Sequence, residues 1–171
     1  MAITTLAGAN GSDHTTLVGT DLADSFAIDS DKTYVDGLEG NDTVTAGSAI
    51  SDLIVVSGSD ADRVTLSAEA LKTNIDLGLG ADTITVNDFS GSIYGGGSND
   101  TITLSTNRVI TNALIRGDGG ADEFNLKTIT GTIVNSNSDD DTINVTVSAT
   151  NSSVYGGRQR DSITIADVTN G

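Results

Sequence analysis

The chain has 171 residues, with 8 Lys and Arg against 24 Asp and Glu, and so a formal net charge of −16. A surface this acidic repels nucleic acid and anionic membranes and attracts cations. The chain has no Cys, which excludes disulfides and thiolate metal sites, and no apolar run reaches the roughly 20 residues that a membrane-spanning helix needs.

Residues 1–16 show no clear pattern, and we predict an irregular N-terminal cap or a partial first coil there. The stretch Met1–Ala9 lacks the basic and apolar parts of a secretion signal, so we expect any export to use a route without an N-terminal signal peptide. The only histidine, His14, is expected on the surface.

From residue 17 onward one unit returns eight times. Each unit has an aspartate with apolar residues two and four positions after it and seven positions before it. A period near 20 residues, held this often, is typical of a solenoid, in which each coil buries its apolar side against the next. The eight aspartates are Asp24, Asp42, Asp62, Asp82, Asp100, Asp122, Asp141 and Asp161.

The unit that begins at Asp82 illustrates the expected coil. Residues 82–87 alternate between polar and apolar, with Ile84 and Val86 on one face, as in a half-buried strand. Residues 91–94 predict a second short strand, and the Gly-rich residues 95–99 a tight turn. We therefore predict an all-β fold: a single right-handed parallel β-solenoid of about eight coils over residues 17–171, with two strands and two turns per coil.

The longest unit, from Asp100 to Asp122, carries extra residues, which we expect to form an outward bulge at Asn107–Asn112. The chain stops soon after the eighth aspartate, at Gly171, and no capping helix follows. Because an open solenoid end exposes unpaired backbone, we expect 1–171 to be one domain that either belongs to a longer protein or docks its open end on another subunit or a second copy.

The turns before the aspartates are rich in glycine. Those at 37–42, 77–82, 95–100 and 117–122 resemble the calcium-binding motif of the RTX (repeats-in-toxin) family, Gly-Gly-x-Gly-x-Asp-x-U-x, where U is apolar. The resemblance runs from Gly19 to Ile165. It implies Ca²⁺ between successive turns, held by turn carbonyls and aspartates. The implied metal-site residues are Asp42, Asp62, Asp82, Asp100, Asp122, Gly78, Gly80, Gly95, Gly97, Gly117 and Gly119.

Elementary chemistry favours the same site. Ca²⁺ takes about six to eight oxygen ligands, and carboxylates stacked about 4.8 Å apart repel one another unless a cation lies between them. The alternative is a structural ladder in which the aspartates bond turn amides or hydroxyls without metal. One motif per coil predicts one metal column, with the best sites between Asp82 and Asp100 and between Asp100 and Asp122. Where glycines are lost before Asp161, we expect Arg158 and Arg160 to replace a cation.

No catalytic constellation is present, so we do not expect an enzyme. The resemblance implies a calcium-stabilised structural segment outside the cell: secreted, surface-layer, adhesin or appendage. The main alternative is a calcium-independent fibre or decoration subunit, for instance of a phage virion. Two further alternatives are an ice-binding face built from outward threonine pairs such as Thr83 and Thr85, and a carbohydrate-binding row built from Tyr34, Tyr94 and Tyr155.

Overall fold

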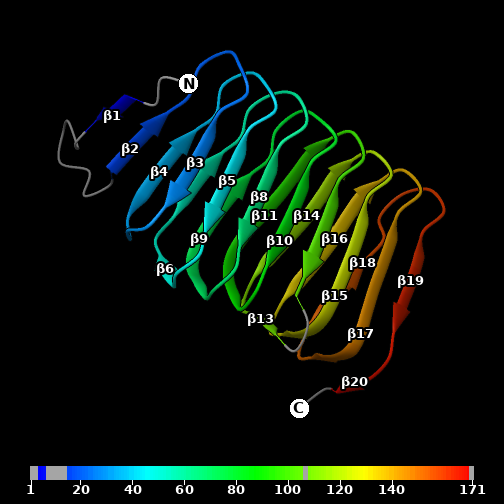
Figure 1. Cartoon of the computed structure of the whole chain (residues 1–171). Helices are drawn as coiled ribbons and strands as arrows, with labels where there is room; N and C mark the ends of the chain where they lie inside the picture. Colours follow the sequence, from blue (N-terminus) through cyan, green and yellow to red (C-terminus); the bar gives the residue numbers. More distant parts are fainter. Residues whose placement is uncertain (1–3, 7–14, 106–107, 170–171) are drawn as a thin grey trace.

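The computed structural model describes residues 4–6, 15–105 and 108–169. All of its regular elements are β-strands, and the parallel strands stack into a solenoid of about eight coils, as predicted (Figure 1). The chain progresses coil by coil along the long axis, so the N-terminal and C-terminal coils lie at opposite ends. Within the described ranges, no helix has the length and apolar character to cross a membrane.

The coils together build three columns of parallel strands, which we number in chain order from the repeat aspartate. The first column consists of β3 (Ser25–Ile28), β5 (Thr43–Ala46), β8 (Arg63–Leu66), β10 (Thr83–Val86), β12 (Thr101–Leu104), the first halves of β15 (Glu123–Thr130) and β17 (Thr142–Thr150), and β19 (Ser162–Ile165). Equivalent repeat positions pair across it: Ile84, for example, lies between Val64 and Ile102.

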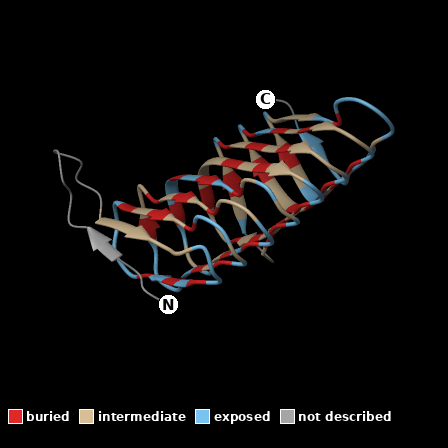
Figure 2. Cartoon of the chain, turned by 90° about the horizontal axis from the view of Figure 1, so that it is seen from above, coloured by how far each residue is buried: buried red, intermediate tan, exposed pale blue. Residues whose placement is uncertain are grey.

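The third column precedes the next aspartate. It consists of β2 (Thr15–Val18), β4 (Thr33–Asp36), β7 (Ile54–Val56), the end of β9 (Ala70–Asp76), the end of β11 (Phe89–Gly97), β14 (Leu114–Gly119), β16 (Ile133–Ser138) and β18 (Ser153–Tyr155). The predicted apolar positions of both columns face inward and form one continuous core (Figure 2). In the last coil Ile163 is 43% exposed, whereas its register partner Ile143 is fully buried.

The second column was not expected. The coils that begin at Asp24, Asp62, Asp82, Asp122 and Asp141 have two strands each, as predicted, whereas β6 (Ile50–Ser51) and β13 (Val109–Thr111) add a third strand after Asp42 and Asp100. This column contains β6, β13, β20 (Val168–Thr169) and parts of β9, β11, β15 and β17. Its inward residues include Ile50, Phe89 and Ile110, all buried. They follow their aspartates by eight, seven and ten residues, and this variable offset hides them from a search for a fixed period.

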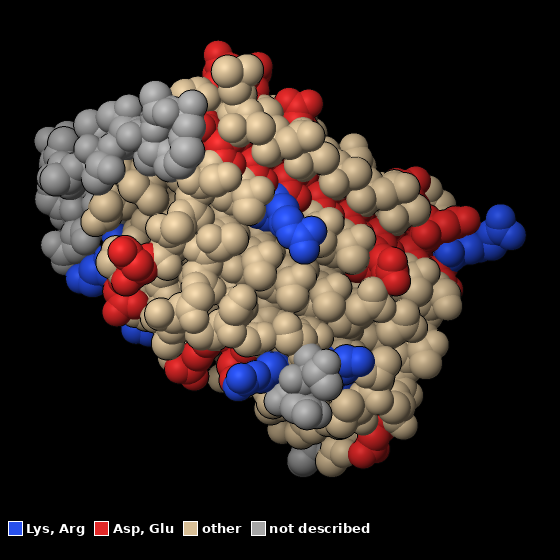
Figure 3. Space-filling model, viewed as in Figure 1, with Lys and Arg blue, Asp and Glu red and all other residues tan. Residues whose placement is uncertain are grey.

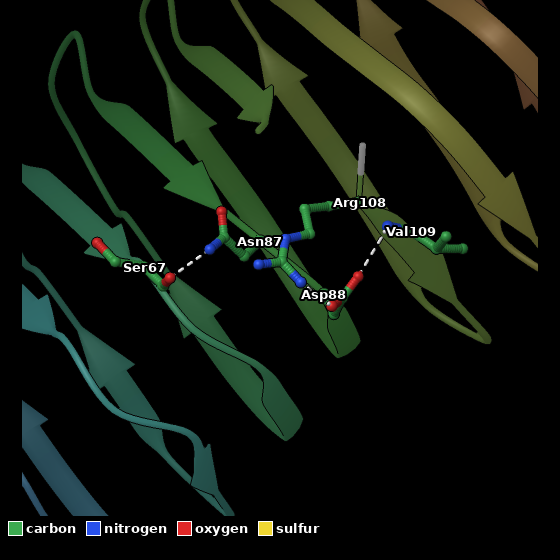
Figure 4. Close-up of polar contacts among 5 residues, drawn as sticks. All are labelled: Ser67, Asn87, Asp88, Arg108 and Val109. Atoms are coloured by element: carbon green, nitrogen blue, oxygen red, sulfur yellow. Dashed lines mark hydrogen bonds and ion pairs between the residues drawn. The ribbon is translucent and has the colours of Figure 1, made fainter. Parts of the chain in front are cut away.

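The predicted outward bulge is wrong where the structure describes it. Residue 107 lies outside the described residues, but β13 pairs with both β11 and β15 and buries Ile110. Asp88 binds this segment to the preceding coil, since its carboxylate accepts hydrogen bonds from the Val109 amide and the Arg108 guanidinium, each at 3.0 Å (Figure 4). Nearby, the Asn87 side-chain amide donates to the Ser67 carbonyl. The described part of this segment therefore belongs to the second column and to the core.

The first coil begins with β2 at Thr15, two residues before the predicted start of the repeats. The strand β1 (Thr4–Leu6) pairs with β2 in antiparallel orientation, whereas the pairings of the three columns are parallel. The N-terminal edge of the third column is therefore paired with a strand from outside the repeat.

Candidate functional site

The Gly-rich turns connect the third column to the first, and they share one backbone conformation. In seven of the eight turns, the residues four and two positions before the aspartate have positive φ, for example Gly78 (87°) and Gly80 (143°) before Asp82. Glycine adopts this region without steric cost, which explains the predicted motif. The turns that have lost glycines keep the conformation with other residues, such as Leu38 (76°) and Asp60 (75°). In these turns the conformation persists without glycine, whereas the turn before Asp24, with Thr20 and Leu22 at the two positions, does not adopt it.

The repeat aspartates form a column along these turns, which we call the aspartate column. All of them except Asp161 are at most 3% exposed, so their carboxylates face the interior. From Asp42 onward, the Oδ1 atom of each aspartate accepts a hydrogen bond from the amide of the aspartate one coil earlier. The N–O distances are 2.7–2.9 Å, and 3.2 Å at Asp161. The aspartates thus connect successive coils through hydrogen bonds to main-chain amides.

The second oxygen of these carboxylates has no such partner. The Oδ2 atoms of six aspartates are buried and accept no hydrogen bond from the described residues: Asp42, Asp62, Asp82, Asp100, Asp122 and Asp141. A buried polar atom without a partner costs about 1–3 kcal/mol, and more when it is charged. Six such atoms in one line indicate that something outside the described chain, a proton or a cation, completes them.

Turn carbonyls lie beside these oxygens. A Cβ atom built on Gly95 would lie 2.6 Å from Asp100 Oδ2 and 2.6 Å from the carbonyl oxygen of Gly117 in the next coil. The same construction on Gly37 meets Asp42 Oδ2 at 2.3 Å and the Ser57 carbonyl at 2.2 Å. A carboxylate oxygen and a main-chain oxygen of the next coil therefore approach the same place. Both are hard donors of the kind that Ca²⁺ prefers.

Burial is the largest influence on the pKa values of the column, and it raises them. It raises the pKa of Asp62 and Asp100 to about 7, and that of Asp82 and Asp122 to about 6. The amide hydrogen bond from the preceding aspartate opposes this effect, while the negative charges of Asp82 and Asp122 add to it at Asp100. At neutral pH these carboxylates are therefore costly to ionise unless a cation accompanies the charge.

A pH dependence follows for the metal-free protein. Because the folded-state pKa values lie above 3.8, the unfolded chain loses these protons first as the pH rises. This contribution to stability is complete below about pH 4 and is lost as the pH rises through 6–7. We expect a lower urea midpoint at pH 8 than at pH 5 in metal-free buffer. An equal or higher midpoint at pH 8 would contradict the assignment.

A second, outer set of side chains caps the same turns. The Oδ2 atoms of Asp60 and Asp139 accept hydrogen bonds from the amides of Gly40 and Gly120, each at 3.1 Å. Asn99 Oδ1 likewise accepts from the Ala121 amide at 2.9 Å. Asp60 and Asp139 stand two residues before Asp62 and Asp141, where the motif has glycine. In the structure they supply acceptors to the preceding coil that glycine lacks.

The predicted glycines fall into three groups. Gly78 and Gly80 provide positive φ, and Gly95 and Gly117 occupy the inward position five residues before an aspartate, facing its Oδ2. Gly97 and Gly119 have neither property, and a Cβ on Gly119 would meet nothing nearer than 3.8 Å. Their place in a metal site remains a prediction without local structural support.

Acidic side chains gather along the edge that these turns form, as a diagonal band on the face shown in Figure 3. Within the described residues, no three His, Asp or Glu side chains come together as a metal-binding cluster. A cation in the column would therefore depend on main-chain carbonyls as well as on one or two carboxylates. The predicted replacement by arginine is not observed: in the described part of the chain, neither Arg158 nor Arg160 forms an ion pair with Asp161.

The alternative surfaces are less regular than expected. On the outward face of the first column, one row of threonines aligns in register: Thr45, Thr65, Thr85 and Thr103. Arg63 interrupts the neighbouring row between Thr43 and Thr83. The three tyrosines do not form one row. Tyr34 pairs with Ile54, whereas Tyr94 lies in another row beside Arg116, whose guanidinium is 5.8 Å from its ring centre, and Tyr155 is three coils further on. No pocket forms among the described residues.

No family model, curated protein or solved structure matches the chain. The likeness to RTX repeats therefore rests on the turn motif and its period alone.

Proposed function

We propose that this solenoid is a non-enzymatic structural domain whose fold is stabilised by Ca²⁺ bound between coils along the aspartate column. The observation that carries the proposal is the line of six buried Oδ2 atoms without partners, three of which lie beside a turn glycine: those of Asp42, Asp100 and Asp122. The RTX-like motif and the net charge of −16 support it.

The two oxygens of each repeat aspartate have different roles in this proposal. Oδ1 holds the amide of the preceding coil and so fixes the side chain in place. Oδ2 and the neighbouring turn carbonyls would hold the ion, which supplies positive charge to the ionised column. Because the unfolded chain has no such arrangement, binding free energy becomes folding free energy. Repeat domains of this kind suit places where calcium is about 10⁻⁴–10⁻³ M or higher, so we propose a role outside the cell, on a surface or in a secreted protein.

One observation favours a second candidate, a calcium-independent structural rod such as a fibre or virion subunit. The Oδ1 ladder connects every coil from the first aspartate to the last without metal. In this case protons rather than cations would neutralise the buried Oδ2 atoms.

Thermal unfolding followed by circular dichroism separates the two candidates. The protein is melted at pH 7.5 in EDTA and then in calcium raised stepwise to about 10 mM, above the affinity range of extracellular calcium modules. We expect the melting temperature to rise steeply with calcium. Magnesium at the same concentration is the control, since it demands a tighter octahedral site and should have little effect. Equal melting temperatures in EDTA and calcium would support the calcium-independent rod.

A further inference from the structure

The residue five positions before an aspartate is buried from the second coil onward, and where it is glycine it lies against the Oδ2 atom of that aspartate. Register places these residues in one row. The amides of Gly19, Gly37, Ser57 and Leu77 donate to equivalent carbonyls of the next coil, and β11, β14 and β16 align Gly95, Gly117 and Ser136. The row is therefore not uniform: it contains glycine, serine and leucine, in a place where glycine leaves the carboxylate oxygen directly beside the backbone.

Two members of the row carry a side chain that fills the place that glycine leaves empty in other coils. Leu77, in the coil of Asp82, is fully buried, and its methyl groups offer no ligand to a cation. Ser136, in the coil of Asp141, is also buried, and its hydroxyl donates a 2.5 Å hydrogen bond to the Gly156 carbonyl of the next coil. That carbonyl corresponds to the ones that glycine leaves beside Oδ2 in other coils.

In the first coil, hydrogen bonds within the turn already occupy the Oδ2 atom of the aspartate. Asp24 Oδ2 accepts hydrogen bonds from the Thr20 amide at 2.6 Å and the Thr20 hydroxyl at 2.8 Å, so this oxygen is already satisfied. Ser57, in the coil of Asp62, differs from Ser136 because its buried hydroxyl has no hydrogen-bond partner. The four remaining carboxylates with a buried, unpartnered Oδ2 have glycine or an unpartnered serine at the row position: Asp42, Asp62, Asp100 and Asp122.

We infer that the residue five positions before each aspartate decides whether a cation binds between that coil and the next. Leu77 then divides the column into two separate pairs of calcium sites. The inference rests on the proposed function. It removes the site predicted between Asp82 and Asp100, and it assigns to Ser136 the place that a cation takes in other coils.

The test counts bound calcium by isothermal titration calorimetry at pH 7.5. The wild-type protein should bind four ions, one at each carboxylate whose row position holds glycine or the unpartnered Ser57. Ser136→Gly frees the Gly156 carbonyl and should raise the number to five. Gly117→Ala places a methyl group 2.0 Å from Asp122 Oδ2 and 3.0 Å from the Ser136 carbonyl, and it should lower the number to three.

Matched controls carry the same chemical change at positions outside the row. Gly47→Ala adds a methyl group outside the column, with no other atom within 4 Å, and Ser92→Gly removes a hydroxyl on the outward side of β11. Both should still bind four ions. If Ser136→Gly and Gly117→Ala also bind four, the inference is wrong while the proposed function stands. A wild-type protein that binds no calcium overturns both. Should Gly117→Ala fail to fold, Ser136→Gly carries the test alone.

Discussion

Replacement of Asp100 by alanine should strongly destabilise the solenoid, and replacement by asparagine should not. Asp100 Oδ1 accepts the Asp82 amide at 2.8 Å, and alanine leaves that buried donor without a partner, which costs about 1–3 kcal/mol in addition to the lost packing. Asparagine keeps an acceptor oxygen at the same place and removes the buried charge. In EDTA at pH 8, urea unfolding should therefore show a lower midpoint for Asp100→Ala and an equal or higher one for Asp100→Asn.

The same pair of variants separates the two roles of the column when calcium is present. Both substitutions remove the charged Oδ2, so both should lose part of the calcium-induced rise in melting temperature. A full calcium response in Asp100→Asn would count against the metal assignment of this residue. A normal fold and stability for Asp100→Ala in EDTA would show instead that the Oδ1 ladder contributes little.

Ile84→Asp should unfold most of the protein. Ile84 is fully buried in the first column between Val64 and Ile102. The change loses an apolar side chain, worth about 2–5 kcal/mol, and buries a carboxyl group without a partner. Together these costs approach the whole stability of a typical domain, about 5–15 kcal/mol. We expect the far-ultraviolet signal of the folded strands to be lost at room temperature.

The adjacent residue supplies the control. Thr83 lies on the outward face of β10, between Arg63 and Thr101, so Thr83→Asp places the same carboxylate in solvent beside a guanidinium-bearing residue. Its melting temperature should change by no more than a few degrees, since surface substitutions usually stay within about 0.5 kcal/mol. If Ile84→Asp melts like Thr83→Asp, the inward and outward faces of the first column have been assigned the wrong way round.

Local chemistry explains why the motif predicted the turns so well. A turn with positive φ at two positions favours glycine, and an aspartate after it is visible in the sequence as a fixed neighbour. This rule does not hold at Asp60 and Asp139. These residues adopt positive φ without being glycine, and their side chains accept a hydrogen bond from an amide of another coil. This contact involves residues about 20 positions apart and leaves no local signature.

The sequence by itself determined the repeat, its parallel stacking and the inward positions of the first and third columns, because burial at a constant offset from the aspartate leaves a periodic trace. Only the tertiary structure showed where the strands of the second column lie, because their offset from the aspartate varies. It also showed that the two oxygens of each carboxylate have different contacts. Oδ1 meets an amide, and Oδ2 meets glycine, serine or leucine, only after adjacent coils are stacked in register. The physical reason is that hydrogen bonds and close contacts between coils depend on which residues lie at the same height, and the spacing along the chain does not specify this where the coils differ in length.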